Sequence, residues 1–262
     1  MDIIKSKDNG KIRCVRSLSS KKGRDEENAF IVEGIKFIKE AIGEKAHIKS
    51  LVFNENTLIK TQTKEIYDFA LKSEIEIIIC QDNVFKTVAD TMSSQGVIAV
   101  INRKKNTKTI DDFKFAIMCD RIQDPGNLGT IIRTADAFGP AAVILNKGCA
   151  DEYNPKVVRA SAGAIFRVPF IHSDSDKEML NQLKESGYLI ISTVVDSEHS
   201  FEDIDMNEKI CVVVGNEGQG VSREIAESSH MGVTIKMTGL SESLNASIAA
   251  GISIYEIRKK LL

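Results

Sequence analysis

The chain has 262 residues, of which 42% are hydrophobic and 27% are charged, and its formal net charge is -2 at pH 7. This composition is typical of a globular protein with one large domain or two small ones. No apolar run reaches the ~20 residues that cross a bilayer, and no secretory apolar core follows Lys5, so we expect a cytoplasmic protein that binds no membrane. Five cysteines stand singly, which favours a reducing compartment and disfavours zinc and disulfides, so we expect no metal.

Positive charge gathers near the amino terminus. Residues 1–112 hold 20 Lys+Arg and 17 Asp+Glu, a net charge of +3, and the remainder carries -5. Basic residues outnumber acidic ones most strongly in the first 24 residues, at Lys5, Lys7, Lys11, Arg13, Arg16, Lys21, Lys22 and Arg24. Such a basic arm can neutralise phosphates and attract nucleic acid. A solvated helix and loop that only keep the protein soluble would have the same composition.

The first part of the chain predicts a small α/β domain. Strands are expected at 30–32, 48–53, 75–80 and 97–101, and helices at 34–41, 61–72 and 82–90. Their alternation indicates a sheet with helices packed on it. The stretch 102–109 is polar and basic, which is typical of a linker. We therefore expect a first domain over 1–102, a linker over 103–112 and a second domain over 113–262.

The second domain repeats the alternation of strands and helices. Strands are expected at 115–119, 141–145, 166–171, 188–194, 210–214 and 232–236, and helices at 127–138, 154–160, 176–186, 222–228 and 244–261. This pattern predicts a second α/β sheet.

The most informative motif runs from Asp120 to Gly139, where a Pro/Gly turn leads from a buried strand into a helix. Asn127 stands where an N-cap is expected, and one apolar face follows at Leu128, Ile131, Ile132, Ala135 and Phe138. Arg133 lies off that face, near the carboxyl end of a strand, where open α/β sheets bind ligands. The motif alone leaves open that Asn127 only caps the helix and Arg133 is a solvated surface residue.

A second motif follows the apolar strand 210–214. Three glycines at 215, 218 and 220 let the backbone turn tightly and approach a flat or anionic ligand. Their order matches neither the dinucleotide fingerprint nor a phosphate-binding P-loop. Glu217 in this turn favours a hydrogen-bonding or ion-pairing task, although a simple turn with an exposed glutamate fits as well.

A third motif, over 237–251, is a hydroxyl- and amide-rich loop that leads into the last helix. Ser243 or Asn245 lies near the expected N-cap. Small residues in the helix permit close backbone approach, and the larger contacts are expected from Leu244, Ile248, Ile252 and Tyr255. Close packing against another element or another subunit follows.

Together, these three stretches resemble the motifs of the SpoU (TrmH-like) RNA ribose 2′-O-methyltransferases of the SPOUT superfamily. The resemblance covers roughly 113–262, and residues 28–101 look like the L30e-like substrate-binding domain that many members carry. It implies a SPOUT α/β domain with a deep trefoil knot after a small L30e-like α/β domain. It further implies S-adenosylmethionine as cofactor, RNA as substrate, and a homodimer whose active site takes residues from both subunits.

The resemblance also assigns site residues. The reactive groups would be Asn127, Arg133, Glu217, Ser243 and Asn245, and the cofactor would lie against Thr193, Gly215, Gly220, Ile235 and Leu244. A guanidinium has a pKa above ~12 and is poorly suited to act as a base, so Arg133 is expected to hold RNA phosphate and stabilise alkoxide charge. Glu217 would orient Arg133, while Ser243 and Asn245 would fix the loop around cofactor and ribose.

The substrate follows from the domain organisation by the same resemblance. An auxiliary domain and a basic arm fit a large structured RNA, which favours 23S (large-subunit) rRNA over tRNA. A member that confers resistance to a ribosome-binding antibiotic would look much the same. Two other classes are weaker: a non-enzymatic RNA-binding dimer, and a nicotinamide-dependent oxidoreductase, for which the glycine fingerprint is missing.

Overall fold

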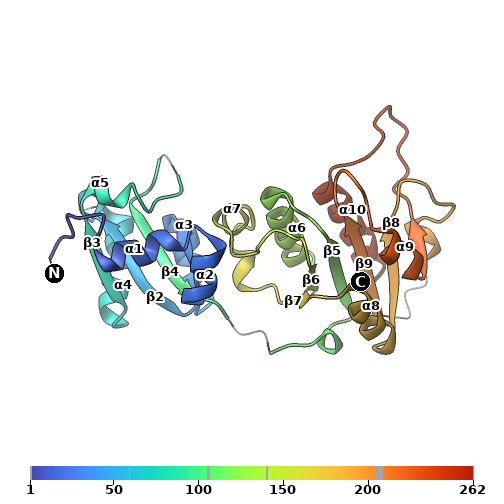
Figure 1. Ribbon diagram of the computed structural model, residues 1–262, viewed down its shortest axis with the longest axis horizontal. Coiled ribbons are helices and arrows are strands. Elements are labelled where there is room, and N and C mark those ends of the chain that lie inside the picture. The colour runs from blue at the N-terminus through green and yellow to red at the C-terminus, as the bar shows by residue number, and fades with distance from the viewer. Residues whose placement is uncertain are drawn as a thin grey trace. The chain divides into compact units, whose positions relative to one another are not determined.

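The computed structural model describes residues 2–58, 60–91, 93–104, 107–139, 141–204 and 209–261. The chain divides into two compact units (Figure 1). One consists of Met1–Lys105 and Asp151–Phe166, and the other of Asn106–Ala150 and Arg167–Leu262. The segment 151–166, which the sequence places within the second domain, thus packs with the amino-terminal unit. Within the described ranges, no helix is long and apolar enough to cross a membrane.

The amino-terminal unit is a four-stranded sheet with helices on it. Its elements are α1 (Gly10–Ser17), α2 (Lys21–Glu27), β1 (Ala29–Glu33), α3 (Ile35–Gly43), β2 (Ile48–Asn54), η1 (Glu55–Thr57), α4 (Thr61–Lys72), β3 (Glu76–Cys80), α5 (Asp82–Phe85), β4 (Val97–Asn102), α7 (Pro155–Ala160) and η3 (Ala164–Phe166). The strand order is β1-β4-β2-β3, in which β4 is antiparallel to both neighbours and β2 and β3 are parallel. The helix expected at 82–90 ends at Phe85, after which the Thr87 and Val88 amides donate to the carbonyls three residues back, at 3.0 Å each, as in a turn.

The basic segment at the amino terminus is folded onto this sheet. Asn9 caps α1 by accepting from the Lys11 amide (2.9 Å), and the α1 residues Ile12 and Val15 join the core beneath the sheet. The Ile4 amide donates to the Ile79 carbonyl (2.8 Å), which holds the first residues beside β3. The segment is therefore an integral part of the unit.

Arg24 belongs to the interior and not to a basic surface. Its side chain is 2% exposed and forms an ion pair with Asp151, with Nε and Nη2 at 2.8 and 2.5 Å from Oδ2. Nη1 also donates to the carbonyls of Leu18 (2.8 Å) and Ser19 (2.9 Å). The expectation that Arg24 is part of a phosphate-binding arm is wrong, because its donors are already used inside the unit.

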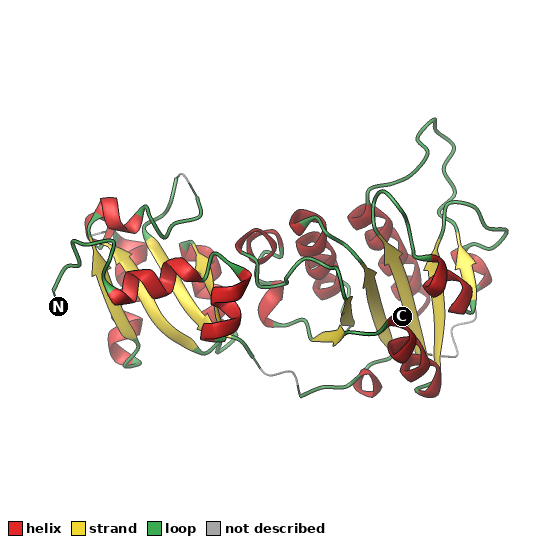
Figure 2. Ribbon diagram, viewed as in Figure 1, coloured by secondary structure: helices red, strands yellow, loops and turns green. Residues whose placement is uncertain are grey.

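The second unit is a six-stranded sheet with helices on both faces (Figure 2). Its elements are η2 (Ile110–Asp112), β5 (Phe115–Asp120), α6 (Pro125–Ala137), β6 (Ala142–Asn146), β7 (Phe170–Ser173), α8 (Asp176–Glu185), β8 (Tyr188–Thr193), η4 (Phe201–Asp203), β9 (Lys209–Gly215), α9 (Arg223–Ser228), β10 (Met231–Val233) and α10 (Ala246–Leu261). All neighbouring strands in the order β10-β8-β9-β5-β6-β7 are parallel. Central β5 and β9 are buried along their length, as continuous apolar runs in parallel sheets require. The strand expected from 166 begins only after Pro169, which has no N–H to donate to a ladder.

Helix α10 packs on α6 and β9 through its small and aliphatic residues. Ala250, Ile254 and Ile257 are buried, whereas Ile248 is 52% and Tyr255 49% exposed. Ile248 and Tyr255, which were expected to pack against another element or another subunit, therefore lie on the outer face of α10. Phe138, which was expected on the buried face of α6, is also 39% exposed and meets the Tyr255 ring edge-on.

Candidate active site

The candidate site lies at the carboxyl edge of the second sheet, where the order of strands reverses. The chain passes from β5 outward through β6 and β7, and then crosses to β8 on the other side of β9. In doubly wound sheets, ligands bind outside the carboxyl ends of the strands at such a reversal. The loops that follow β5 and β9 both lie at this point.

The loop after β5 is capped differently from the sequence expectation. Asp124, and not Asn127, is the N-cap of α6: its Oδ1 accepts from the Asn127 amide at 2.8 Å. Pro125 fixes the helix start, because proline suits the first helical position and its missing N–H is not needed there. The Asp-Pro pair was the sequence signal for this cap. The side chain of Asn127 is thereby left to act elsewhere.

Three predicted site residues from three distant motifs are joined by hydrogen bonds. Asn127 Nδ2 donates to Glu217 Oε1, and Asn245 Nδ2 donates to Asn127 Oδ1 at 3.0 Å. A carboxylate only accepts, so Glu217 determines which end of the Asn127 amide faces it. The Asn127 oxygen then requires a donor from Asn245. One carboxylate thus orients both amides.

Asn245 also begins the last helix. Its Oδ1 accepts from the Ser247 amide (2.9 Å) and the Ile248 amide (3.3 Å), as an N-cap does. Of the two candidates at this helix start, the structure selects Asn245. The cap therefore ties Asn127 and Glu217 to the start of α10.

Arg133 and Ser243 are not bonded to this group. Both are exposed, and among the described residues neither side chain has a hydrogen-bond partner. Glu217 pairs with Asn127, and not with Arg133 as its expected orienting role required. Arg133 projects from α6 with its donors available to a ligand.

The residues expected at the cofactor lie on neighbouring strand ends. Thr193 ends β8 and Gly215 ends β9, and Thr193 pairs with Val233 at the end of β10. Ile235 follows two residues after that strand, and Leu244 directly precedes Asn245. Four of the five predicted contacts are thus placed around the same edge of the sheet by the register of three strands and by the α10 cap.

The glycines of the second motif make the turn after β9 compact. A Cβ on Gly215 would lie 2.0 Å from the Gly220 carbonyl carbon, so no other residue fits there. The Gly220 amide donates to the Asn216 carbonyl (2.8 Å), and Gly220 has φ +66°, which favours glycine. A Cβ on Gly220 would meet nothing within 4 Å, which leaves open space beside the turn.

Two cysteines of the second unit, Cys149 and Cys211, are poor nucleophiles. Burial raises the pKa of Cys149 to about 11 and that of Cys211 to about 12. Both remain protonated at neutral pH, and only a thiolate is strongly nucleophilic. The polar side chains that the site offers to a ligand are therefore its amides, its carboxylate and the guanidinium of Arg133.

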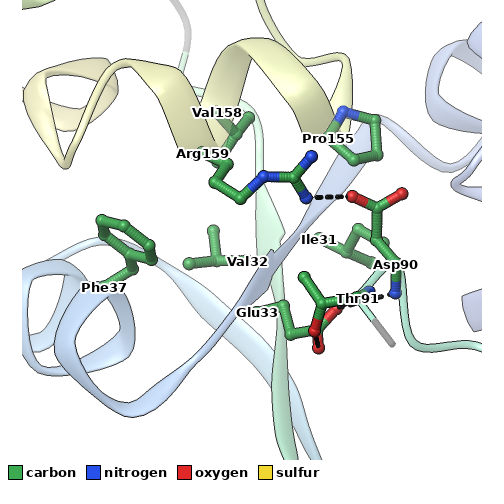
Figure 3. A pocket seen from close by; sticks show the side chains of 9 residues that line it. All are labelled: Ile31, Val32, Glu33, Phe37, Asp90, Thr91, Pro155, Val158 and Arg159. Atoms are coloured by element: carbon green, nitrogen blue, oxygen red, sulfur yellow. Dashed lines mark hydrogen bonds and ion pairs between the residues drawn. The ribbon is translucent and has the colours of Figure 1, made fainter. Parts of the chain in front are cut away.

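A hollow in the amino-terminal unit is too small to be the cofactor site (Figure 3). Its volume of about 20 Å³ accommodates one water molecule. Among its lining residues, Arg159 forms an ion pair with Asp90, and Glu33 accepts from the Asp90 amide at 2.7 Å. The lining residues are Ile31, Val32, Glu33, Phe37, Asp90, Thr91, Pro155, Val158 and Arg159.

The second unit, with its parallel sheet, edge site and amide-rich loops, defines a ligand-binding α/β enzyme domain. The model of the SpoU rRNA methylase family matches residues 114–255, and that of the MRM3-like substrate binding domain matches 9–99. The chain belongs to the SpoU rRNA methylase family.

Relatives resemble the chain over its full length. It is 30% identical over 258 residues to the 23S rRNA (guanosine(2553)-2′-O)-methyltransferase RlmP of Bacillus subtilis, covering 98% of this chain and 100% of that protein. The AdoMet-bound rRNA methyltransferase from Sinorhizobium meliloti has a TM-score of 0.87 and 27% identity, covering 100% of this chain and 98% of that one. The SpoU methyltransferase AviRb from Streptomyces viridochromogenes, in complex with AdoMet, has a TM-score of 0.85 and 25% identity, covering 97% and 98%.

These findings confirm the predicted family, the mixed α/β fold and the enzyme class. The protein is an RNA methyltransferase, and its methyl donor is S-adenosylmethionine. The trefoil knot that the resemblance implies stays a prediction.

Proposed function

We propose that this enzyme transfers a methyl group from S-adenosylmethionine to a ribose 2′-hydroxyl of 23S rRNA. The observation that carries this proposal is the similarity to RlmP, which extends over 98% of the chain and therefore includes both units.

The residues at the sheet edge fit the cofactor. Thr193 and Gly215 end adjacent strands, and the space beside Gly220 is open. Small residues and backbone at this edge leave room for a flat group, which Ile235 and Leu244 would contact from the loops. The bound cofactor supplies an activated methyl group on a sulfonium, so the protein has to align the acceptor hydroxyl and manage one proton.

Arg133 is the charge-stabilising group of this proposal. It is exposed on α6 and has no side-chain partner within the described parts of the chain. A guanidinium keeps its proton, so it would hold RNA phosphate and stabilise negative charge that develops on the 2′-oxygen. The proton would leave to phosphate or water.

The other four reactive residues would shape the site around the ribose. Glu217 orients the Asn127 amide, and Asn127 in turn orients Asn245. This arrangement replaces the expected contact between Glu217 and Arg133. Ser243, exposed two residues before Asn245, would close the loop over cofactor and ribose.

The two parts of the chain would have separate functions, RNA binding and methyl transfer. Residues 1–102 would bind RNA, 103–112 would link, and 113–262 would transfer the methyl group, apart from the segment 151–166 that packs with the amino-terminal unit. The amino-terminal unit carries basic side chains that, among the described residues, make no ion pair, at Lys5, Lys7, Arg13, Arg16 and Lys21. Cations without an internal partner are available to phosphate.

A homodimer is supported by the outer faces of α6 and α10. The rings of Phe138 and Tyr255 meet edge-on, with their centres 5.8 Å apart, and Ile248 lies exposed on the same face of α10, about two turns before Tyr255. Large apolar side chains that gather on a surface are typical of subunit interfaces. The protein would act in the cytoplasm, without a metal and without a membrane.

Mapping ribose methylation across total RNA tests this proposal. A strain that lacks the gene should lose one 2′-O-methyl group from 23S rRNA, and the gene should restore it. Loss of a methyl group from tRNA instead would redirect the substrate, and an unchanged map would refute the proposed activity.

A further inference from the structure

We infer that Asp120 is a positioning residue for methyl transfer, which holds the loop carrying Glu217 in its reactive position. The inference rests on the proposed function. Asp120 is the last residue of β5, and its side chain is 0% exposed. A fully buried carboxylate is costly unless its oxygens are hydrogen-bonded and its charge is offset, so its partners indicate what it stabilises.

Both oxygens of Asp120 accept from groups that follow three different strands. Oδ1 accepts from Asn146 Nδ2 at 2.8 Å, at the end of β6. Oδ2 accepts from Arg121 Nη2 at 2.9 Å and from the Ser222 backbone amide at 2.6 Å. Ser222 closes the loop that follows β9. The carboxylate therefore joins the ends of β5 and β6 to this loop.

The same dipeptide holds the other end of the loop. Asn216, directly after β9, donates from Nδ2 to the Arg121 carbonyl at 3.0 Å. Arg121 has φ +54°, a left-handed conformation that is unfavourable for a residue with a side chain. Such strain persists where surrounding bonds enforce it, and it is found at functional sites.

The loop from 216 to 222 is thus bound at both ends to Asp120 and Arg121, and Glu217 lies between the two attachments. Glu217 bonds Asn127, which bonds Asn245. Releasing one end of the loop would move the Glu217 carboxylate, which orients the side-chain amides of Asn127 and Asn245. Asp120 touches none of these three side chains directly, so it acts through the loop.

The first test is Asp120→Asn, which keeps the size of the side chain. All three partners of Asp120 are donors, so the new amide nitrogen faces a donor whichever way it is turned. We expect kcat to fall about 100-fold with little change in KM for RNA, because displacement of a reactive group slows the transfer step itself. Asp203→Asn, which removes a hydrogen-bonded carboxylate of the η4 capping box, is the control for general loss of stability.

A matched pair at Ser222 tests the same contact and leaves Asp120 in place. Ser222 has φ -60°, which proline adopts, so Ser222→Pro removes the amide donor without changing the local backbone angle. Ser222→Ala keeps the donor and removes a buried hydroxyl that has no hydrogen-bond partner among the described residues. We expect kcat of Ser222→Pro to be about 100-fold below that of Ser222→Ala.

Hydrogen exchange of the segment 215–222 measures positioning directly, without RNA or cofactor. Exchange should be about ten-fold faster in Asp120→Asn and in Ser222→Pro than in the wild type and in Ser222→Ala. If Asp120→Asn does not fold, the Ser222 pair decides. Equal hydrogen exchange and equal kcat in Ser222→Pro and Ser222→Ala would overturn the inference. If the wild type does not methylate RNA, the proposed function is refuted. The hydrogen exchange of the two variants then still tests whether Asp120 positions the loop.

Discussion

Arg24→Ala should destabilise the amino-terminal unit strongly, although the residue lies in the basic segment. Arg24 is 2% exposed and Asp151 10%, and the arginine donates to Asp151 and to two backbone carbonyls. Truncation would leave a buried carboxylate without its cation. It would also leave the Leu18 and Ser19 carbonyls without this donor.

The expected loss follows from these contacts. Breaking a buried ion pair by removing one partner costs about 3–5 kcal/mol, since the remaining charge stays desolvated. For a unit of this size, such a loss lowers the unfolding midpoint by roughly 10 °C or more. By contrast, Lys22→Ala removes an exposed cation that lies 3.7 Å from Glu26, and should change stability by less than about 0.5 kcal/mol.

Thermal unfolding of the full chain would measure the loss of stability, and hydrogen exchange in α1 and α2 would locate it in the amino-terminal unit. The double variant Arg24→Met with Asp151→Leu should be more stable than Arg24→Ala, because it leaves no unpaired charge. An Arg24→Ala midpoint equal to that of Lys22→Ala would refute the interpretation of Arg24 as an interior residue.

Three further outcomes are expected. Arg133→Ala should lower turnover by ~100-fold or more with nearly unchanged cofactor affinity, and Arg133→Lys should recover little, because lysine lacks the planar guanidinium group. Single-turnover kinetics would measure the transfer step and calorimetry the cofactor affinity. An active alanine variant would contradict the prediction. Neutralising Lys5, Lys7, Arg13, Arg16 and Lys21, which make no ion pair among the described residues, should flatten the slope of log RNA affinity against log salt by about one unit per lost phosphate contact. Neutralising Lys11 and Lys22, which form ion pairs, should change this slope less. Equal slopes for the two sets of variants would contradict the prediction. Cys149 and Cys211 should resist thiol reagents at pH 8 until the protein unfolds, because burial raises their pKa to about 11 and about 12; rapid labelling of the folded protein would show that they ionise.

Elements with strong local signals could be predicted from the sequence. The strands β2, β5 and β9 agree with the expected ranges to within one residue at each end, and α4 begins and ends where expected. Periodicity identifies which residues are apolar, but not which neighbour covers them. The outward positions of Tyr255 and Phe138 therefore could not be read from helical spacing alone.

The site was predictable as a set of residues but not as a network. Asn127, Glu217 and Asn245 were identified through their motifs, and the structure adds that they bond one another. Asn127 is separated from Glu217 by 90 positions and from Asn245 by 118, and no local sequence pattern indicates contacts over such separations. Asp120 begins the first motif but received no role from the sequence, since its partners lie at or after the ends of three different strands.

The most direct test of the central claim is the nucleoside that the purified protein produces. The full chain would be incubated with unmodified 23S rRNA and isotopically labelled S-adenosylmethionine, and the RNA would be digested to nucleosides and analysed by mass spectrometry. A single labelled 2′-O-methylnucleoside, absent with Arg133→Ala, is the predicted result. A label on a base, or no label with intact RNA and bound cofactor, would contradict the proposal that this protein methylates a ribose hydroxyl.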